Sequence, residues 1–469
     1  MTTFEGSIGT WWVEGDEDRH FSGYVELVAE DAEPWKLVLD GAPDTDPYEP
    51  FSSGLRFHGL TGVGPLTLQN AHLRSGTSHH RGCVNQTWHG TVLTKRSHLG
   101  EGQRFDGAAF KLPDLIRWVG PTRANVHNRP AVELRAGVES LPRFESTLDD
   151  GTVVTLLVGE MTRHGVITDS REVLAWYRLT HDDGLDESRV EQVELALTRL
   201  HAILMSRTVR AHELEFWWDD ADGATRTVEV IDRSERPEPE QRPHDPLVDT
   251  SDIDFDNFIR RWVRLHDKAV AAVASAAPNL HTGYLSTEII DACTALEHLA
   301  VGVMPEPVLT DAEARALEAL ETAGVGSKLR KRAERAYLQG HQSFEAKLIA
   351  VAETLGEESA RWILGDNLKY WAHCVMRLRN SLVHGGPLPD GMTDDVPFSV
   401  AVLRTVRTVL RFGLLVEAGY ANRAAGEPAE LFRRDGASTI GHPSAEYIWE
   451  LNWLSDVSGY WSGWYGRIR

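Results

Sequence analysis

The stretch DRSERPEPEQRPHDPLVDTSDIDFD, from Asp232 to Asp256, divides the chain into two parts. It concentrates proline and acidic residues and has few apolar ones, a composition typical of a linker. Before it, apolar residues recur with a period of about two; after it, the period is about 3.6. We therefore expect residues 232–256 to join a domain of strands to a domain of helices.

Residues 1–231 contain short alternating runs separated by Gly, Pro, Asn and Asp. Examples are SGYVELVAED, WKLVLDG, GPLTLQNAHL, GTVVTLLVGE, REVLAWYRLT and TRTVEVID. Alternation lets one face of a sheet pack on a core while the other meets water. These runs predict an antiparallel β-rich domain, arranged as a sandwich or barrel, with a helical interruption at RVEQVELALTRLHAILMSR.

Residues 257–424 show helical periodicity and predict an all-α bundle. Its segments are NFIRRWVRLHDKAVAAVASA, STEIIDACTALEHLAVGVM, DAEARALEALETAG, SFEAKLIAVAETLG, NLKYWAHCVMRLRNSLVHGG and FSVAVLRTVRTVLRFGLLVEAG. Residues 425–469 form a tryptophan-rich segment that we expect to dock on its own protein or on a partner. The predicted fold class is α+β.

Charge and cysteine content narrow the classes of function. The chain has 469 residues and a net charge of −22, so as a whole it repels nucleic acid and anionic membranes, and any polyanion must meet a local basic patch. Its three cysteines lie far apart, which fits a reducing compartment and predicts a cytoplasmic protein. The N-terminus does not read as a signal peptide, and no apolar run approaches the ~18 residues of a membrane span.

The stretch MRLRNSLVHGG, from Met376 to Gly386, ends one of the predicted helices with an unusual group of polar side chains. An apolar stripe of Leu368, Trp371, Val375, Leu378 and Leu382 predicts which face is buried. Arg377, Asn380 and His384 share the opposite side, whereas Arg379 falls near the margin of the stripe. An arginine there needs a partner, such as Glu297.

A purely structural interpretation of this stretch remains open. Cations near a helix C-terminus interact favourably with the helix dipole, and Gly385 can supply a left-handed cap. Capping alone, however, does not explain a second arginine at the core margin or an asparagine one turn before the histidine.

The stretch RNSLVH, from Arg379 to His384, resembles the Arg-x-x-x-x-His signature of HEPN domains, helical bundles of which many are metal-independent endoribonucleases. The preceding ALEHL at Ala295–Leu299, the asparagine directly after the arginine, and the closing HGG fit this resemblance. The N-terminal runs GTWWVEGDEDRHFSGYVEL, FHGLTGVGPLTLQNA and FDGAAFKLPDLIRWVG are similar to the β-rich domain that accompanies HEPN domains in ApeA-type anti-phage proteins.

The resemblance implies that Arg379 and His384 are catalytic and that Asn380 assists. Histidine can exchange a proton with a ribose 2′-OH or a leaving 5′-oxygen, and arginine can stabilise the charge on phosphate. The expected products are a 2′,3′-cyclic phosphate and a 5′-hydroxyl, formed without metal or other cofactor. Arg377 is expected to be an auxiliary phosphate contact.

Two further groups of residues need a role. Arg404, Arg407 and Arg411 share one face of the last long helix, and SKLRKRAER holds a second basic cluster; both are candidate contacts for an RNA backbone. Five possible zinc ligands lie in the β-rich part, His72, His79, His80, Cys83 and His89, but their spacing matches no familiar zinc pattern.

Three hypotheses follow for the function. The first is an endoribonuclease of abortive infection, with tRNA as the expected RNA and a phage protein as the expected trigger of the β-rich domain. The second is a catalytically inactive HEPN bundle that binds nucleotide or protein, and the third is a zinc-dependent hydrolase. Because one motif supplies one histidine while the reaction needs an acid and a base, we also expect a homodimer or higher even oligomer.

Overall fold

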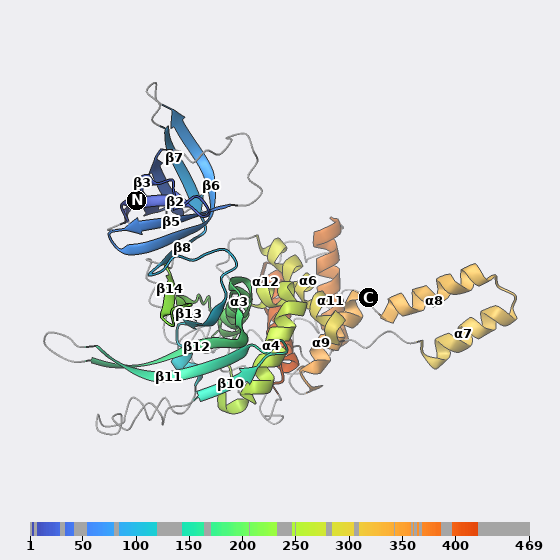
Figure 1. Cartoon of the computed structure of the whole chain (residues 1–469). Helices are drawn as coiled ribbons and strands as arrows, with labels where there is room; N and C mark the ends of the chain where they lie inside the picture. The colour runs from blue at the N-terminus through green and yellow to red at the C-terminus, as the bar shows by residue number, and fades with distance from the viewer. Residues whose placement is uncertain are drawn as a thin grey trace. The chain divides into compact units, whose positions relative to one another are not determined.

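The computed structural model describes most of the two predicted domains. It covers residues 2–3, 7–28, 33–41, 54–78, 84–119, 143–163, 170–205, 207–231, 246–248, 250–277, 284–303, 309–341, 343–357, 360, 364, 368–385 and 396–420. Two compact units are present. The β unit comprises residues 1–116, 129–195 and 210–241, and the helical unit comprises 117–128, 196–209 and 242–469. The predicted α+β class is confirmed (Figure 1).

The strands of the β unit fall into two groups along the chain. The first group is β1 (Thr2–Thr3), β2 (Gly9–Val13), β3 (Phe21–Leu27), β4 (Trp35–Asp40), β5 (Leu55–Thr61), β6 (Gly64–Ser78), β7 (Val84–Gly90) and β8 (Val92–Lys95). The second is β9 (Phe105–Lys111), β10 (Arg143–Thr147), β11 (Val153–Arg163), β12 (Ser170–Leu185), β13 (His212–Asp219) and β14 (Thr225–Val230).

The first group closes into a barrel. Neighbouring strands pair antiparallel in the order β6-β5-β2-β3-β4-β7, and β7 pairs back onto β6, with His72 opposite His89. Strand β8 pairs with both β6 and β14 and thereby continues into the second group, ordered β14-β13-β9-β12-β11-β10. Closure satisfies the backbone of strands that would otherwise be exposed edges. The barrel alternative of the prediction is the observed one.

Aromatic residues fill the barrel because alternate positions of its strands point inward. Its buried cluster includes Trp11, Trp35, Trp88, Phe57 and Phe21. Trp11 lies opposite Gly59 in the β2–β5 register, and a methyl group at Gly59 would lie 2.6 Å from the nearest ring carbon of Trp11. The glycine is therefore needed for the indole to lie flat against the neighbouring strand.

The helices are α1 (Leu115–Trp118), α3 (Glu187–Leu204), α4 (Phe255–Lys268), α5 (Val270–Ala276), α6 (Leu285–Val303), α7 (Asp311–Thr322), α8 (Ser327–His341), α9 (Phe344–Thr354), α11 (Leu368–His384) and α12 (Val396–Glu417), with a 3-10 turn, η2, at Thr250–Asp252. Each long segment with helical periodicity is helical.

The segment predicted as one helix from residue 257 to 276 forms two helices, because Ala269 leaves the helical conformation at φ −130° and ψ 42°. No glycine or proline marks that break.

Helix α6 lies at the centre of the bundle formed by α5, α6, α9, α11 and α12. Its apolar residues Ile289, Ala292, Leu296 and Leu299 are buried. Gly413 of α12 permits a close approach, since a Cβ there would lie 3.1 Å from Val351 and 3.2 Å from Leu299. Among the helices that the structure describes, none has both the length and the apolar content needed to cross a bilayer.

The two units differ from the predicted domains near the linker. Residues 196–209, which include the second half of α3, belong to the helical unit. Leu247 and Val248, inside the expected linker, are buried, and the Leu247 N–H donates to Leu204 O at 2.9 Å. Trp262 likewise donates from Nε1 to Ala196 O at 2.7 Å. Residues 232–245 of the expected linker and the tryptophan-rich segment 425–469 lie outside the described residues.

Gly59→Ala should destabilise the barrel by about 1–3 kcal/mol, because the added methyl group overlaps the buried Trp11 ring. Thermal unfolding followed by tryptophan fluorescence measures this. Gly76→Ala, on β6, is the matched control, since its methyl group would lie 3.8 Å from Gln86. Equal melting temperatures for the two variants would contradict the packing argument.

Candidate active site and ligand pocket

Helix α11 carries the RNSLVH stretch and is fixed by its buried face. Trp371, Val375 and Leu378 of the predicted stripe are buried, and Trp371 Nε1 donates to the buried hydroxyl of Thr405 on α12 at 3.0 Å. The helix ends at Gly385, whose φ is +66° and whose N–H donates to Ser381 O at 2.9 Å. The left-handed cap expected at Gly385 is therefore confirmed, and it fixes where the helix stops.

Arg379 lies between three helices and contacts a residue of each. Its guanidinium carbon is 5.3 Å from the ring centroid of Phe344, the first residue of α9. Its Nη1 donates to Asn380 Oδ1 at 3.2 Å, and its Nη2 is 3.9 Å from Glu297 Oε2 on α6. Glu297 also pairs with Lys347 at 2.6 Å. The expected pairing of Arg379 with Glu297 is thus present, although the glutamate is shared with a closer lysine.

The environment of Arg379 is costly for an arginine. Only 24% of its side chain is exposed, and its Nε is buried with no hydrogen-bond partner among the described residues. Cys293, one turn before Glu297 on α6, is close enough to Arg379 to feel its positive charge. Burial raises the pKa of this thiol to about 12, and the cation of Arg379 opposes that rise. An arginine that is mostly buried and incompletely paired is costly to the fold, so its position needs an explanation.

The other motif residues lie nearer the surface. Arg377 and His384 are exposed, and Asn380 is half-buried, where it accepts the hydrogen bond from Arg379. His384 lies five positions after Arg379, which corresponds to about 140° around a helix and about 7.5 Å along it. The structure therefore brings Arg379 and Asn380 together but directs His384 to a different side of α11.

Of the three arginines on α12, two are held by the bundle itself. Arg407 Nη2 pairs with Glu288 of α6 at 3.1 Å, and Arg411 Nε donates to Ala276 O at the end of α5 at 3.1 Å. Burial lowers the pKa of Arg407, while Glu288 acts in the opposite direction. Arg404 is exposed.

The arginines of α12 do not converge with Arg379 in one copy of the chain. Glu288 and Glu297, which hold Arg407 and Arg379, are nine residues apart on α6. This corresponds to about 13 Å along the helix and about half a turn around it. The two ion pairs therefore form on opposite faces of α6.

The candidate zinc ligands are only partly described. His72 and His89 face each other across the β6–β7 ladder, whereas His79, His80 and Cys83 lie outside the described residues. Within the described part of the chain, no group of three or more His, Cys, Asp or Glu residues is arranged to hold a metal.

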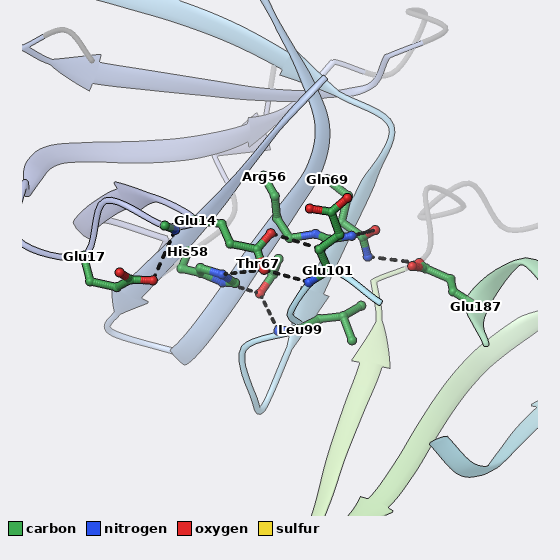
Figure 2. Close-up of polar contacts among 10 residues, drawn as sticks. Glu14, Glu17, Arg56, His58, Thr67, Gln69, Leu99, Glu101 and Glu187 are labelled. Atoms are coloured by element: carbon green, nitrogen blue, oxygen red, sulfur yellow. Dashed lines mark hydrogen bonds and ion pairs between the residues drawn. The ribbon is translucent and has the colours of Figure 1, made fainter. Parts of the chain in front are cut away.

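The β unit contains a polar network centred on Glu14 (Figure 2). Glu14 accepts hydrogen bonds from Arg56 Nη1 at 3.1 Å and from the backbone N–H of Glu101 at 2.7 Å. Nearby, Thr67 Oγ1 accepts from the Leu99 N–H at 3.1 Å and lies 3.2 Å from His58 Nδ1. Burial, together with the neighbouring His98, lowers the pKa of His58 to about 4. His58 is therefore neutral at pH 7 and holds the β8–β9 connection in place.

A pocket of about 670 Å³ opens beside this network, between the barrel and the start of α3. It is lined by Arg56, Gln69, Asn70, Val92, Leu99, Gly100, Gly102, Gln103, Phe105, Asp150, Asp186, Glu187, Ser188, Arg189, Glu191 and Gln192. Gln69 bridges its two sides, because its Oε1 is 3.4 Å from Arg56 Nη2 and its Nε2 donates to Glu187 Oε1 at 3.1 Å.

The charges in the pocket favour a ligand with hydrogen-bond donors. Both arginines are paired, Arg56 with Glu14 and Arg189 with Asp150 at 2.6 Å. Burial raises the pKa of Glu191, and the adjacent Glu187 raises it further. Sequence patterns did not reveal this pocket, since Gln69 and Glu187 are 118 residues apart and no local motif connects them.

Arg379→Ala should lower the free energy of unfolding of the helical unit by about 1–2 kcal/mol, because it removes the contacts with Phe344 and Glu297. His384→Ala should leave it unchanged, since His384 is exposed at the helix end. Thermal unfolding of the two variants measures the difference. A melting temperature that falls equally in both would contradict the assigned environments.

Comparison with known proteins identifies the N-terminal part of the chain. No curated protein and no solved structure matches the sequence. The family of ApeA N-terminal domain 1 matches residues 6–166, which contain the barrel strands β2 to β8 as well as β9 to β11. The β unit of this protein is therefore built on an ApeA-like N-terminal domain.

Proposed function

We propose that the chain is an anti-phage defence endoribonuclease that cleaves RNA without a metal, using Arg379, Asn380 and His384 of a HEPN-like helical unit. The observation that carries this proposal is the environment of Arg379. Its guanidinium is held by Asn380, Phe344 and Glu297, at the end of a helix whose last residue is the exposed His384.

The residues present suit cleavage by attack of the ribose 2′-OH. The imidazole of His384 can accept the proton of the 2′-OH or donate one to the leaving 5′-oxygen. A guanidinium whose position is fixed before substrate binds stabilises the charge that develops on the phosphate, with little reorganisation. Asn380 acts here as a positioning residue, because its side chain contacts Arg379. Arg377 and Arg404, both exposed, are proposed as further phosphate contacts.

A composite site between two copies fits the direction of the side chains. Arg379 and His384 lie about 140° apart around α11, so one copy does not aim both at the same phosphate. Two copies of α11 facing each other across a two-fold axis would supply a histidine to give a proton and another to take one. We therefore propose a homodimer, or a higher even oligomer, that associates through the helical unit.

The ApeA-like domain supports a role in defence against phage. In this proposal the β unit detects the infection, with a phage protein as the trigger, and the helical unit cuts RNA, with tRNA as the first substrate to test. Within the described part of the β unit, the polar pocket beside Arg56 and Glu187 is a candidate site for a ligand.

A second candidate function is an inactive HEPN-like bundle that binds nucleotide or protein. The observation that favours it is the same environment of Arg379, because the pairing with Glu297 also occurs where an arginine only joins helices. Activity assays separate the two candidates.

His384→Ala should abolish both RNA cleavage and growth arrest while leaving the fold intact, because the residue is exposed and lies away from the buried stripe of α11. RNA termini from induced cells measure this, since the proposed chemistry leaves 2′,3′-cyclic phosphates and 5′-hydroxyls. His298→Ala, an exposed histidine on α6, is the matched control and should remain active.

Normal toxicity of His384→Ala would refute the proposed site. The same assay with EDTA tests the zinc-dependent alternative. Cleavage that stops on chelation and returns with zinc would move the active site to the region of His72 and His89.

The active species should be a dimer or a higher even oligomer in light scattering, because Arg379 and His384 of one copy point to different sides of α11. Dilution should reduce specific activity when it reduces the fraction of assembled protein. A monomer with full activity at nanomolar concentration would contradict the composite site and would require a second acid or base within one chain.

A further inference from the structure

Helices α7 and α8 form a hairpin that packs mainly on itself (Figure 1). Of the described side chains in α7, only Leu317 is buried, and those described in α8 are half-buried or exposed. The capping box of Thr310 and Glu313 starts α7, and Gly324 turns the chain at a φ of +74°. A hairpin with such a thin apolar seam contributes little to the core of the bundle.

One face of α8 is uniformly cationic. At about 100° per residue, Lys328, Lys331, Arg332 and Arg335 fall within about 100° of one another around the helix. All four are exposed, and none has an ion-pair partner among the described residues. We call these four residues the basic stripe. Arg330 lies on the other side of α8, where it pairs with Glu321 of α7.

Repulsion among the cations of the basic stripe destabilises α8 when no anion is bound. Lys328 and Arg332 are four residues apart, as are Lys331 and Arg335, and like charges at this spacing destabilise a helix. The repulsion is relieved when a polyanion lies along the stripe. The stripe rises about 10 Å along α8, which matches about three phosphate steps of one strand at about 3.4 Å each.

The hairpin is joined to the two elements that hold Arg379. Helix α6, which carries Glu297, leads into α7, and α8 ends at His341, three residues before Phe344. Taking about 3.8 Å for each extended residue and 1.5 Å for each helical one, the Cα of Arg335 lies at most about 20 Å from that of Phe344. The corresponding limit for Lys328 is about 31 Å. A short RNA segment is therefore long enough to reach from the stripe to Phe344, whose ring the guanidinium of Arg379 contacts.

We propose that the basic stripe of α8 binds the phosphate backbone of the RNA whose cleavage is proposed above for Arg379 and His384. The stripe supplies affinity without reading bases, because lysine and arginine contacts to phosphate carry no sequence information. It also explains how a chain of net charge −22 can hold a polyanion, through a local surface that the overall charge does not cancel. This inference rests on the proposed function for the identity of the ligand as RNA.

The test measures RNA binding by the full-length protein without cleavage. The probe is a fluorescent 30-nucleotide single-stranded RNA of mixed sequence, and His384→Ala is present in every protein so that the probe stays intact. Lys331→Gln with Arg332→Gln should weaken binding about tenfold at fixed salt and reduce the slope of log affinity against log salt by about 1.4. Glutamine keeps a high helix propensity, so α8 is retained.

The matched control is Lys268→Gln with Arg315→Gln, which removes two exposed cations outside the stripe, one of them on α7. It should bind RNA as the parent does. Unchanged affinity and salt slope in the stripe variant, or an equal loss in the control, would overturn the proposal. A stripe variant that binds RNA normally but changes its mass in light scattering would overturn it too, in favour of an interface between copies.

Failure of the enzyme proposal is distinguishable from failure of this one. If His384→Ala proteins bind RNA through the stripe while the unaltered protein cuts no RNA, the proposed activity is wrong and the binding surface stands. If the unaltered protein cuts RNA and the stripe variant binds it normally, only the binding surface is wrong.

Discussion

The helical unit depends on how a guanidinium is accommodated at the edge of an apolar core. Arg379 is mostly enclosed, and its contacts with Glu297, Phe344 and Asn380 come from α6, α9 and α11. Removing any one partner would leave a mostly enclosed cation less well compensated. The relative positions of the three helices and the orientation of the guanidinium are thus determined together. In the proposed active site, the guanidinium would therefore keep its geometry before substrate binds.

The β unit achieves rigidity by a different constraint, the closure of its barrel. The β6–β7 pairing removes the free edges, and the indole of Trp11 covers Gly59 on the neighbouring strand. The buried His58 then holds the β8–β9 connection through Thr67 and Leu99. The pocket beside Arg56 is consequently lined by residues whose backbone is fixed on one side by the barrel and on the other by the start of α3. Such preorganisation suits recognition, because little ordering is left to oppose binding.

Local patterns were sufficient to predict the elements and the fold class. WKLVLDG became β4 at Trp35–Asp40, and the helix predicted around RNSLVH became α11 at Leu368–His384. The pairing of Arg379 with Glu297 could be anticipated, since an arginine beside a buried stripe needs a carboxylate and ALEHL offers one on a neighbouring helix. Long-range pairings could not be anticipated from the sequence. Three features depend on segments that are distant in sequence. They are the pairing of β7 with β6, the hydrogen bond from Gln69 to Glu187, and the contacts by which Arg407 and Arg411 hold α6 and α5.

The arginines of α12 and the cations of α8 show why a basic pattern in sequence does not by itself identify a nucleic-acid surface. Both patterns place several cations on one helical face. In α12 the neighbouring helices supply Glu288 and the Ala276 carbonyl, which hold Arg407 and Arg411 within the bundle. In α8 the partner helix pairs with Arg330 on the far side and leaves the stripe facing water. Since affinity for a polyanion comes from cations whose counterions can be released, the exposed stripe is the better electrostatic surface of the two. Tertiary packing, rather than the count of basic residues, therefore decides which cations of an acidic protein remain exposed to a polyanion.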